Sequence, residues 1–358
     1  MKRVLSTHAG GRLGLGMTRG LKAAPEDIYV VAADGGKHDL HRAYGDEKMQ
    51  IPLANSPSYL PFIKDVIREK NIDFFWPAHD GEIAVVSADE DLRKFTFLPP
   101  AEMVRTCHSK TLTHEKLVAA GVPVPRSMPI ANEHDLANAF EQLGGDIWVR
   151  AIRGAGGRGS LPTTDYQTAK LWIDFHRGWG NFQAAERLPG QRLAWESVWF
   201  EGELVFCQCV VPEAIGFSNL TLSGITGIPA LNRWTDDPVM TAIGQSAIKA
   251  VHPRPHGIMT VDMTVHADGS PRVTEINIGR FGSGGVVNSR ALGFNLPYMT
   301  LQLATGGDPC MSLPAINPFP QDWWIILGFS VEPVEVPMTV PDATAADYES
   351  RLMKLGYK

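Results

Sequence analysis

The sequence predicts an α/β protein whose N-terminal part is a parallel, doubly wound sheet and whose later parts contain antiparallel hairpins. In the first hundred residues, short apolar runs alternate with amphipathic stretches, as in parallel strands connected by helices. Farther along, paired apolar runs flank Glu201-Gly202 and Asp268-Gly269, two dipeptides that favour tight β-turns. The change from helical crossovers to hairpins predicts more than one structural unit.

Composition excludes several classes of protein. The chain has 358 residues, of which 44% are hydrophobic and 20% charged, which is ordinary for a globular protein with a buried core. A net charge of −6 argues against non-specific binding to nucleic acid. The longest strongly apolar run, 323–329, is too short to span a bilayer, and the run after Arg3 is too short for a secretory signal. We therefore expect a cytoplasmic protein with no membrane partner and no nucleic-acid partner.

The N-terminal unit is predicted to contain three strands, which begin at Val4, Ile28 and Asp73. A helix is expected after the first strand, because apolar residues recur every four positions from 13 to 21. A second amphipathic stripe at 59–67 predicts the helix that precedes the third strand. Since the carboxyl ends of parallel strands meet at one edge of a sheet, the segments that follow these strands are expected to lie together.

Two of these segments suggest a small-molecule crevice. Residues 8–16 form a glycine-rich turn, but their spacing is not the G-x-G-x-x-G of a dinucleotide site. His79, Asp80 and Glu82 follow the third strand and are candidates for contacting a substrate. The alternative is that Asp80 caps a helix on a plain surface.

The middle of the chain holds a glycine-rich loop. Helices are predicted at 109–120 and 135–143, separated by a stiff Val-Pro-Val-Pro connector that suits a domain boundary. A strand at 147–150 then leads into the loop 154–159, where four glycines in six residues allow backbone N–H groups to turn toward a phosphate. Arg150 stands at the root of this loop, within reach of phosphate oxygens. A flexible surface loop is the alternative interpretation.

The hairpin around Asp268-Gly269 gives the sharpest chemical prediction. With these two residues as the loop, counting outward places Asp262 directly opposite Glu275 and Thr260 opposite Asn277. Directly opposed side chains have Cβ atoms about 4.5–5.5 Å apart, so two carboxylates placed in this way repel unless a cation lies between them. Oxygens from Asp, Glu and Asn suit Mg²⁺ rather than zinc. The alternative is a solvent-facing pair that neighbouring cations neutralise.

Residues 280–285, Arg-Phe-Gly-Ser-Gly-Gly, follow this strand directly. An arginine beside a metal, together with flexible backbone, favours an anion cradle around Arg280, whereas the alternative is a loose connector to the next helix. A serine or cysteine hydrolase is disfavoured, because the sequence contains no G-x-S-x-G elbow and no clear Cys/His arrangement.

Taken in order, these segments resemble the ATP-grasp superfamily, in particular the branch that includes the large subunit of carbamoyl-phosphate synthase. The resemblance extends over residues 1–308 and rests on the order and spacing of short motifs. The motifs are Trp76-Pro77-Ala78-His79-Asp80-Gly81-Glu82, Ser109-Lys110, Arg150 with the loop 154–159, Ala185-Glu186-Arg187-Leu188-Pro189-Gly190, Val261-Asp262-Met263 and Glu275-Ile276-Asn277. The family usually continues Asn-Pro-Arg, whereas this chain has one residue more, Asn277-Ile278-Gly279-Arg280.

The resemblance implies a domain order and a set of site residues. The implied domains are a Rossmann-like N-terminal domain at 1–106, a small α+β lid domain at 107–186, a C-terminal α+β domain with an antiparallel sheet at 187–312, and an extension at 313–358. The implied catalytic cations are Lys110, Arg150 and Arg280. The implied ATP contacts are Lys110, Arg150, Gly156, Gly157, Arg158, Glu186, Leu188 and Arg192. The implied ligands of two Mg²⁺ ions, with Mn²⁺ as an alternative, are Asp262, Glu275 and Asn277. Arg233 and Arg290 join His79, Asp80 and Glu82 as substrate candidates.

The implied activity is ATP-dependent joining of a small-molecule carboxylate to an amine through an acyl phosphate, with release of ADP and phosphate. Another ATP-grasp phosphoryl transfer, by a small-molecule kinase or in carbamoyl-phosphate-type synthesis, is the alternative. A non-catalytic nucleotide-binding module is a third hypothesis, which a broken metal trio would favour. Homodimers are common among similar proteins, so a homodimer is a further expectation. The sequence names neither the acid nor the amine.

Overall fold

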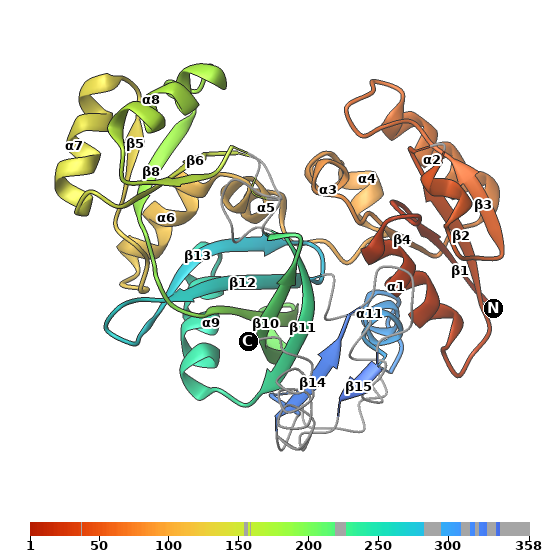
Figure 1. Ribbon diagram of the computed structural model, residues 1–358. Helices are drawn as coiled ribbons and strands as arrows, with labels where there is room; N and C mark the ends of the chain where they lie inside the picture. The colour runs from red at the N-terminus through yellow and green to blue at the C-terminus, as the bar shows by residue number, and fades with distance from the viewer. Residues whose placement is uncertain are drawn as a thin grey trace, which may run out of the picture.

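The computed structural model of the protein contains three β-sheets within the residues that it describes (Figure 1). The described residues are 1–36, 38–153, 157, 159–218, 227–282, 295–308, 316–318, 322–327 and 334–336. A parallel N-terminal sheet and a small antiparallel sheet lie well apart, and a larger antiparallel sheet lies between and below them in Figure 1. This arrangement confirms the predicted mixed α/β fold class.

The N-terminal sheet is parallel, as predicted, and has the strand order β3-β2-β1-β4. Its strands are β1 (Lys2–Ser6), β2 (Ile28–Asp34), β3 (Glu47–Gln50) and β4 (Phe74–Trp76). Its helical segments are α1 (Arg12–Lys22), the 3₁₀ turn η1 (Asp39–His41), α2 (Tyr59–Lys70), α3 (Asp80–Ser87) and α4 (Glu90–Arg93).

Alternating residues of these strands face two different helices, so the sheet is doubly wound. Val4 and Val30 belong to the same buried cluster as Met17 of α1. Their neighbours Leu5 and Val31 belong instead to the cluster that contains α2. Because strand side chains alternate between faces, burial on both sides explains why these strands appear in the sequence as continuous apolar runs.

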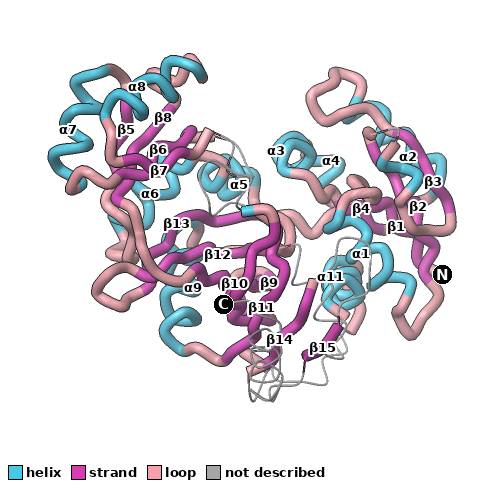
Figure 2. The backbone as a smooth tube through the Cα atoms, in the orientation of Figure 1, coloured by secondary structure: helices cyan, strands magenta, loops and turns pink. Residues whose placement is uncertain are grey.

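The small sheet is antiparallel and has the order β5-β8-β6-β7. Its strands are β5 (Ser127–Ile130), β6 (Ile147–Ala151), β7 (Leu161–Thr163) and β8 (Phe182–Glu186). The helices α5 (Ala101–Cys107) and α6 (Lys110–Ala119) precede it, and α7 (Glu133–Leu143) and α8 (Tyr166–Phe175) lie on its outer side (Figure 2). Val149 packs in the cluster formed with α7 and α8, so the next residue, Arg150, points away from these helices.

The larger sheet has seven strands in the order β13-β12-β9-β10-β11-β14-β15. They are β9 (Arg192–Phe200), β10 (Glu203–Gly216), β11 (Ile228–Thr235), β12 (Gly257–Val265), β13 (Pro271–Ile278), β14 (Trp323–Ile326) and β15 (Val334–Val336). Helix α9 (Pro238–Val251) packs against this sheet, and α11 (Leu296–Ala304) packs against α1. The predicted two-residue turn at Glu201-Gly202 is confirmed, since Phe200 pairs with Glu203 and both turn residues have positive φ, at 53° and 100°.

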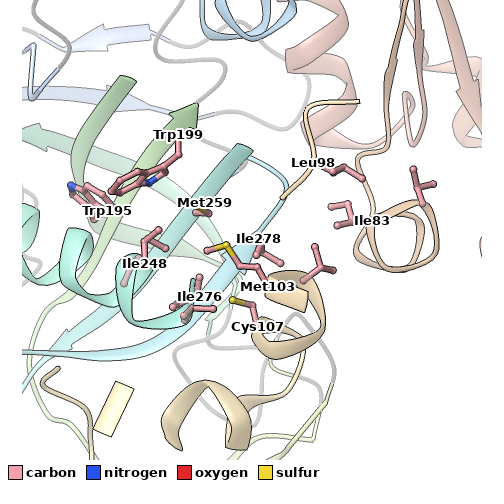
Figure 3. Close-up of a cluster of buried hydrophobic side chains, with 14 of the residues drawn as sticks. Ile83, Leu98, Met103, Cys107, Trp195, Trp199, Ile248, Met259, Ile276 and Ile278 are labelled. Carbon is pink, nitrogen blue, oxygen red and sulfur yellow. The ribbon is translucent and has the colours of Figure 1, made fainter. Parts of the chain in front are cut away.

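A hydrophobic core covers one face of the larger sheet (Figure 3). The core joins buried residues of α5, α9, β9, β12 and β13, among them Met103, Cys107, Ile248, Trp195, Met259, Ile276 and Ile278. Since side chains alternate along β13, burial of Ile276 and Ile278 on this face turns Glu275 and Asn277 toward the opposite face.

Within the part that the structure describes, no helix has the length and apolar character needed to cross a membrane. The three described cysteines, Cys107, Cys207 and Cys209, are buried and free.

Candidate active site

Asp262 of β12 and Glu275 of β13 are direct cross-strand partners, as the sequence predicted. Thr260 and Asn277 form the next matched pair on the same face. The Nδ2 group of Asn277 donates a hydrogen bond of 2.8 Å to Oδ2 of Asp262. Three oxygen-bearing side chains therefore converge on one face of the sheet, at the end of the hairpin that is remote from its turn.

This register arises in a different way from the one predicted. The N–H of His266 donates to the carbonyl of Ser270 at 2.9 Å, so the loop has three residues, 267–269, and not the two of the prediction. Gly269 takes φ 83° in this loop, which is the left-handed position typical of a three-residue hairpin. The pairing nearest the turn is consequently shifted by one residue from the predicted pairing.

A bulge at Thr274 then restores the predicted register. Met263 pairs with Val273, while the next pair is Asp262 with Glu275, so Thr274 is the extra residue. Its Oγ1 donates to the carbonyl of Asp262 at 3.1 Å, which anchors the bulge. The predicted carboxylate pair is therefore correct, although the turn that was used to count it is not.

Two cations from the middle of the chain reach the carboxylate pair. Nζ of Lys110, the first residue of α6, lies 3.2 Å from Oε1 of Glu275. Nη2 of Arg150 donates to the bulge carbonyl of Thr274 at 3.1 Å. Burial lowers the pKa of Arg150, and the charge of Glu275 opposes that effect. Nε of Arg150 is buried and has no hydrogen-bond partner among the described residues, so this guanidinium keeps a donor for a further acceptor.

Arg280 connects the carboxylate pair to the N-terminal unit. Its Nε donates to Oδ1 of Asp80 at 2.7 Å, and its Nη2 donates to Oδ2 of Asp80 at 3.3 Å. The same Nη2 donates to Oδ1 of Asn277 at 3.1 Å. Burial disfavours the charge on Arg280, but the bonds to Asp80 outweigh burial and raise the pKa of Arg280. Three predicted cations thus surround the carboxylate pair, each from a different element.

The candidates at the edge of the N-terminal sheet divide into two roles. His79 is the N-cap of α3, where its Nδ1 accepts from the N–H of Gly81 at 3.1 Å. Glu82 is buried and accepts from the backbone N–H of His79 at 3.1 Å and from Oγ1 of Thr7 at 2.8 Å. Burial raises the pKa of Glu82. Capping is therefore performed by His79 and Glu82, whereas Asp80 bonds to Arg280, two residues past the end of β13.

The electrostatics of the carboxylate pair suit a divalent cation. Burial, followed by the charge of Glu275, raises the pKa of Asp262 to about 6, while Arg192, Arg280 and Asn277 offset only part of that rise. Among the described residues, no three or more His, Cys, Asp and Glu side chains form a ready-made metal cage. Two carboxylates and one amide match the way Mg²⁺ is usually bound, with substrate phosphates completing its coordination. The residues present fit such an ion.

Glu196 of β9 is a site residue that the sequence prediction missed. It is directly opposite Thr260, so it shares the face of Asp262, and it is buried. Nε2 of Gln208 donates to its Oε2. Burial, opposed by Gln208 and reinforced by the charge of Asp262, raises the pKa of Glu196 to about 7. The available signal was a lone carboxylate inside the apolar run 193–199, since buried charges are rare unless they are paired or functional.

The structure describes some of the predicted nucleotide contacts, and others lie outside the described residues. Arg192 lies two residues from Ala194, the partner of Asp262, so it shares the face of the carboxylate pair. The carboxylate of Glu186 accepts from the backbone N–H and from Nε of Arg126, at 2.9 and 2.7 Å. Leu188 is half-buried in the segment that joins β8 to β9. Gly157 has φ 68°, in the left-handed region that favours glycine, whereas Gly156 and Arg158 lie outside the described residues.

Arg233 is not brought to this cluster. Its β11 neighbour Trp234 pairs with Val210, which belongs to the face of Asp262, so Arg233 points to the opposite face. There its guanidinium donates to Glu213 at 2.6 Å and to Asp322 at 3.1 Å. Its charge is satisfied locally within the sheet. Arg290, the other arginine proposed for the substrate, lies outside the described residues.

The three sheets, with paired carboxylates on the larger one, form the ATP-grasp fold, which confirms the expected fold. The chain matches no protein-family model, and no curated protein is similar to it in sequence. The likeness to solved structures nevertheless extends over almost the whole chain.

Three such structures illustrate the likeness. A biotin carboxylase from Campylobacter jejuni, complexed with β,γ-ATP, is 16% identical with a TM-score of 0.68, over 91% of this chain and 75% of that one. An L-amino acid ligase from Bacillus licheniformis is 14% identical with a TM-score of 0.68, over 91% and 80%. The biotin carboxylase domain dimer of a 2-oxoglutarate carboxylase from Hydrogenobacter thermophilus, with MgADP and bicarbonate, is 15% identical with a TM-score of 0.68, over 94% and 83%. The TM-scores and the coverage establish a shared fold.

Proposed function

We propose that this protein is an ATP-dependent carboxylate–amine ligase that works through an acyl phosphate. The observation that supports the proposal is the facing pair of Asp262 and Glu275, surrounded by Lys110, Arg150 and Arg280. Carboxylates that hold a divalent ion, with cations beside them, are the arrangement that a triphosphate requires.

In this proposal, Asp262, Glu275 and Asn277 hold Mg²⁺ at the terminal phosphates of ATP. When bound, the ion neutralises negative charge on those phosphates and favours transfer of the γ-phosphoryl group. Lys110 exchanges its ion pair with Glu275 for a phosphate oxygen, and the unpaired Nε of Arg150 supplies a second donor. The glycine-rich segment 154–159 follows the strand of Arg150 in the sequence, and in this proposal its backbone N–H groups bind the phosphates.

The chemical steps need no protein nucleophile. An oxygen of the substrate carboxylate attacks the γ-phosphorus, the bond to the β-phosphate oxygen breaks, and ADP leaves. The amine then attacks the acyl carbon, the bond to phosphate breaks, and the amine loses a proton as the amide forms. Because water would hydrolyse the acyl phosphate, the lid unit at 107–186 is proposed to close over the site during these steps.

A second candidate is phosphorylation of bicarbonate or of another small acceptor, without transfer to a free amine. It is favoured by the Hydrogenobacter thermophilus structure, which contains bicarbonate together with MgADP. Release of phosphate that requires both a carboxylate and an amine would support the ligase. Release with bicarbonate alone would support this second candidate.

The domain order 1–106, 107–186, 187–312 and 313–358 is part of the same proposal. So is a homodimer, because the Hydrogenobacter thermophilus domain is described as a dimer. Analytical ultracentrifugation at micromolar concentration tests the dimer. A requirement for ATP and free amine substrates suits the cytoplasm, which fractionation tests.

The deciding experiment measures ADP release against a panel of amino acids and small carboxylates, with hydroxylamine present to trap an acyl phosphate. Asp262→Asn and Glu275→Gln are expected to lower turnover at least about 100-fold while the protein stays folded, because each removes a ligand of the ion. Asp268→Asn is the matched control, since Asp268 lies in the exposed turn of the same hairpin and bonds to Ser270. Full activity in either site variant would refute the metal assignment.

A further inference from the structure

A chain of hydrogen bonds runs from α3 in the N-terminal unit to the carboxylate pair in the larger sheet. Asp80 accepts two bonds from Arg280, Arg280 donates to Oδ1 of Asn277 at 3.1 Å, and Nδ2 of Asn277 donates to Asp262 at 2.8 Å. Asp80 and Arg280 are 200 residues apart in the sequence, so this chain exists only through the packing of the two units.

The local structure of α3 leaves the Asp80 carboxylate available for this contact. Asp80 is the first residue of the helix, but the capping bonds come from His79 and Glu82. An acidic residue in the first turn of a helix is favoured by the helix dipole whether or not it has a partner. The two bonds to Arg280 are therefore an additional function of this side chain.

The segment after Asn277 is shaped to make the contact. Two residues, Ile278 and Gly279, separate Asn277 from Arg280, and Gly279 takes φ 79°. A Cβ at Gly279 would lie 2.9 Å from Cγ2 of Ile83, which is on α3. The N–H of Gly279 bonds to the carbonyl of Ile258 at 2.8 Å. The left-handed turn at Gly279 thus packs against α3 and directs Arg280 toward Asp80.

The bonds also determine the orientation of the Asn277 amide. Because Arg280 has only donors, it must face the amide oxygen, and the amide nitrogen must then face Asp262. A carbonyl oxygen has two lone pairs, so Oδ1 retains one for a metal ion while it accepts from Arg280. The acceptor Asp262 and the donor Arg280 thus fix the amide from its two ends, and a fixed guanidinium holds the oxygen in place.

We propose that Asp80 is a positioning residue of the active site. Its carboxylate fixes the plane of the Arg280 guanidinium, and through it the metal-facing oxygen of Asn277. This inference rests on the proposed function, because it takes Asn277 as a ligand of the divalent ion. It gives Asp80 a role in metal binding without direct contact with metal, nucleotide or acceptor.

The test measures Mn²⁺ binding to the protein–ADP complex by electron paramagnetic resonance and by calorimetry, in the wild type, Asp80→Asn and Asp80→Glu. Asp80→Asn is expected to weaken Mn²⁺ binding about tenfold or more, as loss of a supporting hydrogen bond to a metal ligand does. Asp80→Glu keeps the charge and is expected to recover part of the affinity. Asp89→Asn is the matched control: Asp89 caps α4 and pairs with Lys64 at 2.8 Å, so its loss should lower the melting temperature but not Mn²⁺ affinity.

A double-mutant cycle with Arg280→Gln tests the route. If Asp80 acts through Arg280, the effect of Asp80→Asn on Mn²⁺ affinity should largely disappear in the Arg280→Gln background. Wild-type affinity in folded Asp80→Asn, or full additivity in the cycle, would overturn this inference and leave the proposed function intact. Absence of Mn²⁺–ADP binding in the wild type would overturn the proposed function and this inference with it.

Discussion

Lys110 and Glu275 form an ion pair in which Nζ lies 3.2 Å from Oε1. Lys110 begins α6, whereas Glu275 lies on β13 of the larger sheet. The amide N–H of Lys110 also bonds to the carbonyl of Ile152, which follows the strand of Arg150. The start of α6 is thereby fixed between the small sheet and the larger one, and the cation of Lys110 is directed at the carboxylate pair.

Replacing Lys110 should therefore weaken nucleotide binding more than it lowers the stability of the fold. Lys110→Met is expected to lower kcat/KM for ATP about 100-fold or more, since it removes a partly buried positive charge from the proposed phosphate site. Lys116→Met, on an exposed position of the same helix, is the control and should have little effect. Equal losses in both variants would show that the helix, and not the Lys110 charge, was affected.

The bulge at Thr274 leads to a prediction about single-residue deletions in this hairpin. Deleting Ala267 shortens the three-residue loop to two residues and leaves every pair of the hairpin in place, so activity should persist. Deleting Thr274 also preserves the Asp262–Glu275 pair but removes the carbonyl that Arg150 binds, so affinity for ATP should fall about tenfold. Nucleotide titration of both variants distinguishes them. The interpretation would be wrong if the first deletion were the more damaging.

A side chain at position 282 is predicted to displace Glu196 for a steric reason. A Cβ at this position would overlap Oε1 of Glu196, and Glu196 is buried and held by Gln208. Gly282→Ala should therefore destabilise the protein by about 1–3 kcal/mol, as forced overpacking does, and should lower turnover by displacing Glu196. Denaturant unfolding with parallel activity assays tests both effects. Wild-type stability would show that Glu196 has room to move aside.

The Asp80–Arg280 pair should make stability depend on pH in the acid range. Burial opposes ionisation of Asp80, but the bonds and charge of Arg280 outweigh it, so the pKa of Asp80 lies below its ordinary 3.8. A carboxyl group with a depressed pKa stabilises the fold above its unfolded pKa and loses that contribution as pH falls toward the folded value.

The free energies of unfolding of the wild type and Asp80→Asn should accordingly differ most at neutral pH, and this difference should shrink as the pH falls below about 4. Because both side chains are partly exposed, the expected difference at neutral pH is about 1 kcal/mol. Urea unfolding between pH 3 and pH 7 measures it. A difference that stays constant across this range would contradict an ionised Asp80 in the folded protein.

Local pattern was enough to predict the parallel N-terminal sheet and the facing of Asp262 and Glu275. Side chains alternate strictly along strands, so a hairpin that buries Ile276 and Ile278 must present Glu275 and Asn277 on the other face. The direct pairing of Asp262 with Glu275 was counted from a two-residue loop, and it holds with the three-residue loop only because the bulge at Thr274 offsets the additional residue.

Contacts between distant segments depended on tertiary packing. Glu196 appeared in the sequence as one acid in an apolar strand, and only the order of strands β12-β9-β10 places it beside Asp262 and Gln208. Arg233 was a plausible substrate residue until the pairing of β11 turned it to the opposite face. The sequence by itself determined which residues share a strand face, because alternation is a property of the local backbone. Only the packing of the units decided that Asp80 meets Arg280 and that Lys110 meets Glu275, because no local periodicity relates residues so far apart.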